Sequence, residues 1–354
     1  MNNPLPIAGP LSLGDLLDRA FRLYRARFTP FLLTAAIILI PYSLISGLLS
    51  GRFLTGYMDA FGLLMESPDA VNEGMMADML GGFGSMFGGF VVLGILGLVF
   101  NGVVTLALIS QSTAALHEEQ QPIGVSLRRG VSRFIPYAWM SIVQFFVIGL
   151  VTTVVLIPVF LLFGLIAFAG AAIGSAAFGD DGGIVGGIAL VLVFVCGYIF
   201  ALLFAAAPAT YFSARWIGAT PALMAEDLGA MEALGRSWRL TGGRIWRVIG
   251  YTVLLSIITA IVVSLPAALI QQVFLLAAPT LGFGLVTAAS TAITSIFTVV
   301  WTPLSACAVV LLYYDLRVRS EGYDLNLRIQ QMESQLAPRP PDTAQDDSDA
   351  TPYA

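Results

Sequence analysis

Residues 137–170 read YAWMSIVQFFVIGLVTTVVLIPVFLLFGLIAFAG, a stretch without any Asp, Glu, Lys, Arg or His. The hydrocarbon core of a bilayer is about 30 Å thick, and a helix of about 20 apolar residues crosses it. A helix also satisfies its own backbone hydrogen bonds, as a hydrocarbon environment requires. The stretch is therefore long enough to span a membrane as a single helix.

Five further stretches are similarly long and apolar. Charged residues make up only 11% of the chain, against about 25% in soluble proteins. The sequence therefore predicts an all-α, polytopic membrane helical bundle over residues 1–336, with six transmembrane helices. Its six spans are expected at about 30–50, 88–114, 137–170, 185–214, 248–272 and 283–314.

The 17 basic residues are all arginine, and all but Arg52 lie in alternate segments between the spans or at the ends. The intervening segments at 51–87, 171–184 and 273–282 are otherwise acidic or uncharged, and we expect them to be loops. Arginine near the cytoplasmic ends of spans sets the orientation of a membrane protein, so both termini are expected in the cytoplasm. The absence of lysine fits the coding bias of a GC-rich bacterial genome, so we expect the bacterial cytoplasmic membrane.

A weak internal repeat runs through the chain. Residues 17–23 (LDRAFRL) align with residues 234–240 (LGRSWRL) at an offset of 217 residues. In the middle of the chain, LRR at 127–129 precedes FIPY at 134–137, which resembles FTPF at 28–31 of the first unit. Each unit is interpreted as a short amphipathic helix followed by two spans. The sequence therefore predicts three cytoplasmic amphipathic helices in a threefold helix-plus-hairpin repeat.

The first amphipathic helix has the clearest pattern. Ser12 and Asp15 have the spacing of a helix cap. Apolar residues then follow at intervals of three or four and predict a buried face. The charged residues lie on the opposite face. The apolar face is expected to contain Leu13, Leu16, Leu17, Ala20, Tyr24 and Phe28.

Other pairs are expected from their spacing alone. Glu232/Arg236, Asp315/Arg319 and Arg317/Glu321 are four residues apart and are expected to pair on a helix. Gly84/Gly88 and Gly170/Gly174 have the GxxxG spacing that permits close helix approach, although 36 glycines produce such spacings easily by chance.

Five arginines on the amphipathic helices are candidate contacts for lipid headgroups, since such helices can lie in the headgroup layer. They are Arg22, Arg25, Arg236, Arg239 and Arg244. The alternative is that these helices only cover the ends of the bundle and that the arginines only set its orientation.

The sequence contains no cluster or motif of the residue types that catalysis or metal binding requires. His117 is the only histidine, and no phosphate loop or nucleophile elbow is present. The neutral polar residues of the spans are interpreted as interhelical hydrogen-bonding groups rather than a substrate path. We therefore expect no catalytic, cofactor or metal site and no nucleic-acid partner. The neutral residues include Asn101, Gln111, Gln144, Gln271 and Thr302.

Three stretches together resemble a known family. Residues 12–28 (SLGDLLDRAFRLYRARF), 233–251 (ALGRSWRLTGGRIWRVIGY) and 312–325 (LYYDLRVRSEGYDL) are similar to the bacterial family named for the membrane part of glycerophosphoryl diester phosphodiesterases. In some relatives a soluble phosphodiesterase barrel of about 250 residues follows. The catalytic His and carboxylates of that barrel have no counterpart here. The resemblance implies a membrane domain, without the activity of the enzyme.

The sequence thus favours a non-enzymatic integral membrane protein that organises lipid, including anionic lipid, or an unidentified protein partner at the cytoplasmic membrane face. The alternative is a permease, or a permease subunit, for a neutral or lipid-like solute. Residues 337–354 are rich in Pro, Asp, Thr and Ala, and are expected to form a disordered acidic tail.

Overall fold

The computed structural model describes residues 11–66, 73–178 and 182–321, and every regular element within them is helical. The tail expected at 337–354 lies outside the described residues. The elements are α1 (Leu13–Ala26), α2 (Phe28–Glu66), α3 (Glu73–Leu116), α4 (Ile123–Ser132), α5 (Phe134–Phe178), α6 (Gly182–Trp216), α7 (Ala219–Ala225), α8 (Ala230–Leu240), α9 (Ile245–Thr259), a π-helical turn η2 (Ala260–Ser264), α10 (Leu265–Leu276), α11 (Ala278–Leu281) and α12 (Phe283–Glu321).

Six helical segments are long and apolar enough to cross a membrane, which confirms the predicted number of spans. They are Phe28–Thr55, Leu80–Leu116, Phe134–Gly170, Val191–Ala225, Ile245–Leu276 and Gly284–Glu321.

The expected loops at 51–87, 171–184 and 273–282 are wrong, because most of their residues are helical. Helix α2 continues to Glu66 and α3 begins at Glu73, while α5 continues to Phe178 and α6 begins at Gly182. Loss of hydrophobicity marks the end of an apolar stretch, but it does not end a helix. Both hairpins continue because α2 packs against α3 and α5 packs against α6.

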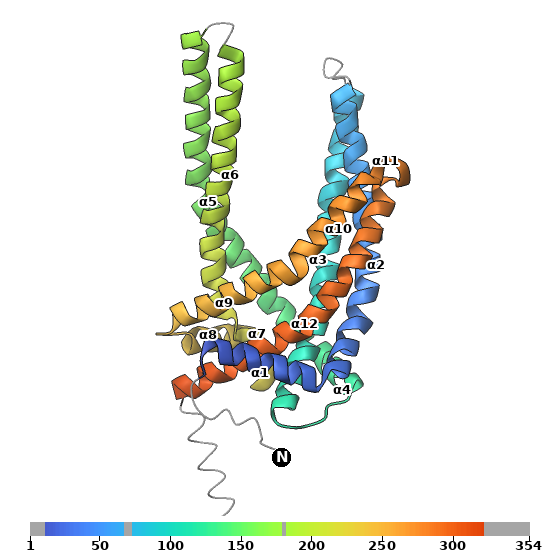
Figure 1. Ribbon diagram of the computed structural model, residues 1–354, viewed down its shortest axis with the longest axis vertical. Coiled ribbons are helices and arrows are strands. Elements are labelled where there is room, and N and C mark those ends of the chain that lie inside the picture. The colour runs from blue at the N-terminus through green and yellow to red at the C-terminus, as the bar shows by residue number, and fades with distance from the viewer. Residues whose placement is uncertain (1–10, 67–72, 179–181, 322–354) are drawn as a thin grey trace, which may run out of the picture.

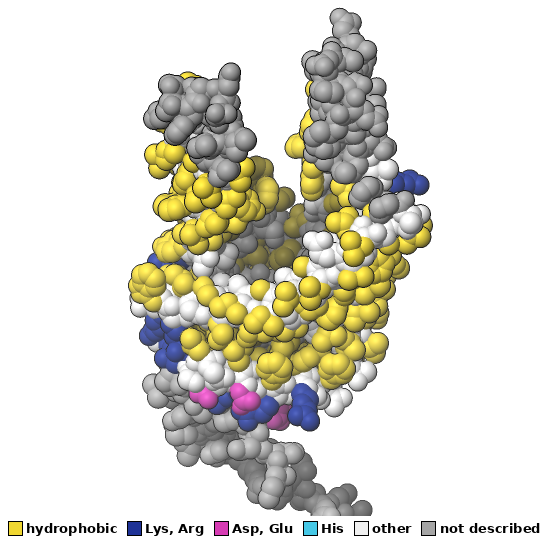
Figure 2. Space-filling view, turned by 45° about the horizontal axis from the view of Figure 1, so that its top comes forward, with side chains coloured by type: hydrophobic (Ala, Val, Ile, Leu, Met, Phe, Trp, Pro, Cys, Tyr) yellow, Lys and Arg dark blue, Asp and Glu magenta, His cyan; other side chains and the backbone are white. Residues whose placement is uncertain are grey.

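The helices form two arms that join at one end (Figure 1). One arm is the α5–α6 hairpin, and the other contains α2 and α3 with α12 packed against α2. Helices α9 and α10 cross between the arms. The short helices α1, α4, α7 and α8 gather at the joined end. Figure 2 shows hydrophobic side chains over the arms and most of the charged side chains at the joined end.

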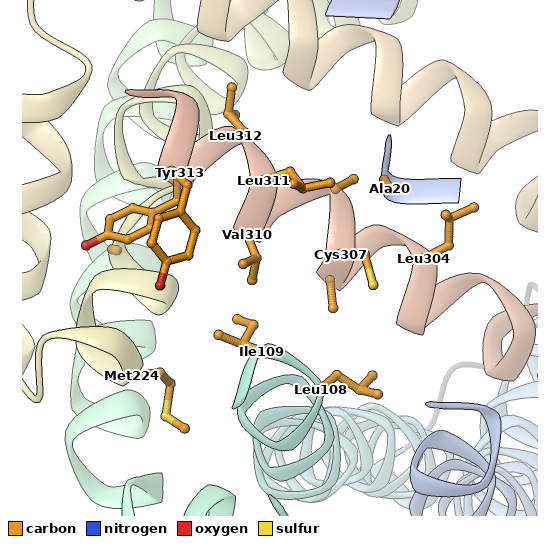
Figure 3. Packing of buried hydrophobic residues seen from close by; sticks show 14 of the residues in the cluster. Ala20, Leu108, Ile109, Met224, Leu304, Cys307, Val310, Leu311, Leu312 and Tyr313 are labelled. Carbon is orange, nitrogen blue, oxygen red and sulfur yellow. The ribbon is translucent and has the colours of Figure 1, made fainter. Parts of the chain in front are cut away.

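The buried core lies at the joined end and is built around α12. In the most apolar window of α12, 61% of the residues are buried, against 6% in those of α5 and α6. Figure 3 shows Ile109 of α3 below Val310 of α12 and Leu108 below Cys307, with Ala20 of α1 beside Cys307 and Leu304. Because the α5–α6 arm buries so little, its apolar side chains are suited to contact with lipid chains.

Helices α2 and α12 approach closely at glycines other than those noted in the sequence. Gly47 and Gly51 of α2 also have GxxxG spacing, and they face α12. A Cβ added to Gly51 would lie 2.5 Å from the carbonyl oxygen of Gly284. By contrast, a Cβ at Gly84 or Gly88 would meet no atom within 4 Å. Within the described part of the chain, the GxxxG spacing of Gly84 and Gly88 therefore does not bring two helices close together.

A short helix stands before three of the spans: α1 before α2, α4 before α5, and α8 before α9. This order is the one that the internal repeat predicts. The threefold relation itself stays a prediction.

Candidate functional site

Helix α1 begins at a reciprocal cap, as its sequence predicts. The Ser12 hydroxyl accepts a hydrogen bond of 3.1 Å from the Asp15 backbone, and the Asp15 carboxylate accepts one of 3.1 Å from the Ser12 backbone. Hydrogen bonding to Ser12 lowers the pKa of Asp15 below its ordinary value. The buried face holds Leu16, Ala20, Leu23 and Tyr24, so Leu23 joins the predicted set, whereas Phe28 is exposed and starts α2.

Helix α8 uses an acidic residue for capping rather than for pairing. The carboxylate of Glu232 accepts a hydrogen bond of 3.0 Å from the backbone N–H of Gly229. The expected Glu232/Arg236 pair is therefore wrong. The first turn of a helix has free N–H groups, and they hold the carboxylate at that end. Arg236 turns instead to two carboxylates from other elements.

Arg236 is the centre of a half-buried ion-pair cluster. Its Nε donates to Glu226 Oε2 at 2.9 Å, and its Nη2 donates to Glu226 Oε1 at 3.0 Å. On its other edge, Nη2 donates to Glu321 Oε2 at 2.9 Å. The Arg236 side chain is only 16% exposed. The planar guanidinium thus links α8 by one forked contact to Glu226, which caps the end of α7, and by a second to Glu321 at the end of α12.

The charge of Glu226 depends on this cluster. Burial raises the pKa of its carboxyl, but hydrogen bonds from Arg236 and from the Tyr313 hydroxyl outweigh burial. The pKa of Glu226 therefore lies below its ordinary value. Glu226 stays ionised at neutral pH, and the cluster keeps its full set of charges.

A second cluster surrounds Asp315, whose side chain is fully buried. Its Oδ1 accepts a hydrogen bond of 3.0 Å from the backbone N–H of Leu11. Its Oδ2 accepts from Arg319 Nε at 2.9 Å and from Arg247 Nη2 at 3.2 Å. This confirms the Asp315/Arg319 pair, and Arg317 likewise pairs with Glu321 at 3.5 Å. The cluster joins the segment before α1, the start of α9 and the end of α12.

The structure separates the five candidate arginines. Arg236 is held in its ion pairs, and Arg244 donates to the backbone carbonyl of Arg319 at 2.7 Å. Arg22 pairs with Asp18 at 2.8 Å, but both side chains remain more than half exposed. Arg25 and Arg239 are exposed. Neither side chain makes a hydrogen bond or an ion pair with the described part of the chain.

One further arginine shares these properties and was missed as a candidate. Arg128 on α4 is exposed and makes no hydrogen bond or ion pair with the described residues. Its signal was the middle unit of the internal repeat, which places Arg128 on the amphipathic helix before the third span. Each of α1, α4 and α8 therefore presents one unpaired, exposed arginine: Arg25, Arg128 and Arg239.

A cavity of about 290 Å³ lies where the two arms meet, and no charged residue lines it. Its polar residues come from five helices. The amide of Gln144 and the hydroxyls of Thr105, Ser213 and Thr220 make no hydrogen bond with the described chain. The other lining residues are Ile109, Ile148, Trp216, Ile217, Thr302, Ser305, Ala306 and Val309.

The remaining neutral polar groups of the spans behave differently from Gln144. Gln111 donates to Thr34 Oγ1 at 2.8 Å, and Gln271 accepts from Ser290 at 2.9 Å, so both form the predicted interhelical bonds. Asn101 donates to the carbonyl of Gly97 within its own helix at 3.1 Å. Thr302 likewise donates to Thr298 at 2.7 Å. The interhelical interpretation is therefore confirmed for Gln111 and Gln271 and wrong for the other three residues.

No group of three or more His, Cys, Asp or Glu side chains in the described ranges could hold a metal ion. Cys307 is buried and its sulfur lies 3.4 Å from the Ser112 hydroxyl, whereas Cys196 is exposed on α6. His117 is exposed and meets the ring of Tyr314 edge-on.

Residues 193–336 match the sequence family described as the membrane domain of glycerophosphoryl diester phosphodiesterase. The match begins within α6 and includes α7 to α12. It therefore contains the residues that α8, α9 and α12 contribute to the two charged clusters. The resemblance noted from the sequence is confirmed over these residues. No curated protein and no solved structure matches the chain.

Proposed function

We propose that this integral membrane protein is non-enzymatic and gathers anionic lipid at the cytoplasmic face of a bacterial cytoplasmic membrane. In this proposal both termini and the amphipathic helices α1, α4 and α8 lie on the cytoplasmic side. The family match supports a membrane domain, and the matched family description names no catalytic domain. The six apolar helices support the multi-pass arrangement.

The observation that carries the proposal is the set of exposed, unpaired arginines on α1, α4 and α8. Half-buried arginines of the same end already have partners: Arg236 has two carboxylates, and Arg244 has the backbone carbonyl of Arg319. Arg25, Arg128 and Arg239 have none in the described chain. A guanidinium binds phosphate oxygens through a planar fork of donors. Each basic residue near an anionic surface contributes about 1 kcal/mol.

Replacing Arg25, Arg128 and Arg239 together by Gln is expected to reduce the anionic lipid that co-purifies with the protein. At about 1 kcal/mol each, the local enrichment should fall roughly fivefold for every arginine removed at low salt. The measurement is mass spectrometry of phosphatidylglycerol and phosphatidylethanolamine retained after gentle purification.

The matched control for this variant is Arg52→Gln, because Arg52 is also exposed but lies near the far end of the first apolar span, Phe28–Thr55, away from the joined end. It should leave the retained phosphatidylglycerol unchanged. If the triple variant keeps the lipid composition of the wild type, the arginines only set orientation and the proposal fails.

The proposed topology has its own test. Reporter fusions after Asp59 and Asp181 are expected to read as external, and fusions after Gln120, Leu228 and Asp324 as cytoplasmic. The physical reason is that the arginines stay on the cytoplasmic side of the membrane. One reversed fusion among the five would contradict the topology.

The uncharged cavity favours a second candidate, a permease or permease subunit for a neutral or lipid-like solute. Unpaired polar groups inside a membrane bundle are typical of a solute pathway. Above the cavity, however, the exposed side chains of α5 are mostly apolar, including Phe145, Leu150 and Leu161. The polar surface is thus local, which favours binding at one point over a continuous path.

A further inference from the structure

We propose that the cavity between the arms binds the uncharged, hydroxyl-bearing headgroup of a single lipid, whose acyl chains lie along the apolar arms. The site is the one on which the second candidate function depends, but binding does not require transport. It shares no residue with the arginines of the leading proposal.

The first argument is the hydrogen-bonding capacity of the cavity. Gln144 offers two amide donors and one carbonyl acceptor, and each hydroxyl of Thr105, Ser213 and Thr220 can donate and accept. These four groups have no partner in the described chain. A polar group left unpaired in an apolar environment costs about 1 to 3 kcal/mol, so a ligand that bonds to them is stabilised.

The second argument is charge. No Arg, Lys, Asp, Glu or His lines the cavity. A phosphate placed there would lose hydration without gaining a counter-ion, which is strongly unfavourable. The chemistry therefore selects a neutral headgroup with hydroxyl or ester oxygens and disfavours a phospholipid headgroup.

The third argument is size and access. The cavity of about 290 Å³ is roughly ten times the ~30 Å³ that one water molecule occupies in the liquid. It is partly open, and its lining includes Ile109, Ile148 and Trp216 beside the polar groups. Figure 2 shows a hollow between the arms, with hydrophobic side chains on its walls. A molecule with a small polar head and long apolar chains matches this combination.

The test is native mass spectrometry of the full chain released from vesicles of equimolar phosphatidylcholine, phosphatidylglycerol and dioleoylglycerol. The wild type is expected to retain one dioleoylglycerol in preference to either phospholipid. Gln144→Leu removes the largest polar group and should reduce that retention roughly tenfold. Ser213→Trp fills the cavity and should abolish the retention.

Thr152→Val is the matched control on α5, because its hydroxyl is also unpaired but does not line the cavity. This variant should retain dioleoylglycerol like the wild type. Detergent melting of all variants checks that they fold, and Gln144→Leu is expected to melt at the wild-type temperature or above. The arginine-to-glutamine triple variant should lose phosphatidylglycerol and keep dioleoylglycerol, so the two proposals fail separately.

Three results would overturn the proposal. Retention of phosphatidylglycerol at a Gln144-dependent site would show that the headgroup is anionic. Equal retention of all three lipids, or retention of none of them, would mean that water fills the cavity. A dimer that Ser213→Trp dissociates would show that a second copy of the chain fills the hollow.

Discussion

Asp315→Asn is expected to cause the largest loss of stability of any single substitution considered for this chain. The carboxylate is fully buried and is shared by Arg247, Arg319 and the backbone of Leu11. An amide of the same shape leaves the two arginines without a buried counter-charge. Breaking a buried ion pair by removing one partner costs about 3–5 kcal/mol. The measurement is thermal unfolding in detergent, monitored by fluorescence-detected size-exclusion chromatography.

Asp18→Asn is the control for this substitution, since it removes the same charge from an exposed pair with Arg22. Exposed pairs contribute about 0–1 kcal/mol, so the melting temperature should hardly change. If Asp315→Asn and Asp18→Asn have the same melting temperature, the buried cluster does not hold the bundle together.

Gly51→Ala is expected to separate α2 from α12. The added methyl group would lie 2.5 Å from the carbonyl oxygen of Gly284 and 2.8 Å from its Cα. Both atoms belong to the backbone, so neither can rotate away. Overpacking of this kind costs about 1–3 kcal/mol. A clear fall in the detergent melting temperature is the expected result.

Gly88→Ala is its matched control, because Gly88 lies in the neighbouring helix α3 and an added methyl group would meet nothing within 4 Å. Replacing glycine by alanine in a helix is ordinarily stabilising by about 0.5–1 kcal/mol. This variant should melt at or slightly above the wild-type temperature. Equal losses at Gly51 and Gly88 would mean that close packing of α2 on α12 is not what Gly51 provides.

The sequence was sufficient for features that depend on neighbouring residues. Six uncharged stretches predicted six spans because hydrocarbon excludes charge over the length of a helix. Ser12 and Asp15 predicted their cap, and Asp315 and Arg319 their pair, because three- and four-residue spacings have fixed geometry on a helix.

Features that depend on distant residues could not be predicted. Arg236 has a candidate partner four residues away in Glu232, but its actual partners, Glu226 and Glu321, come from other elements. The same holds for Gly51, whose closeness to Gly284 depends on how α2 crosses α12. Five helices must come together before the cavity exists, and neither Gln144 nor Thr105 has a local pattern that marks it.

The hydrogen bond between the Leu11 backbone and Asp315 also constrains the order in which the protein folds during synthesis. The two residues are 304 positions apart in the chain. At a synthesis rate of about 5–20 residues per second, the amino-terminal segment waits about 15–60 s for its partner to be translated. During that time the buried face of α1 lacks the α12 residues that later cover it. Closure of the joined end is therefore a late event in biogenesis, and it follows insertion of the last span.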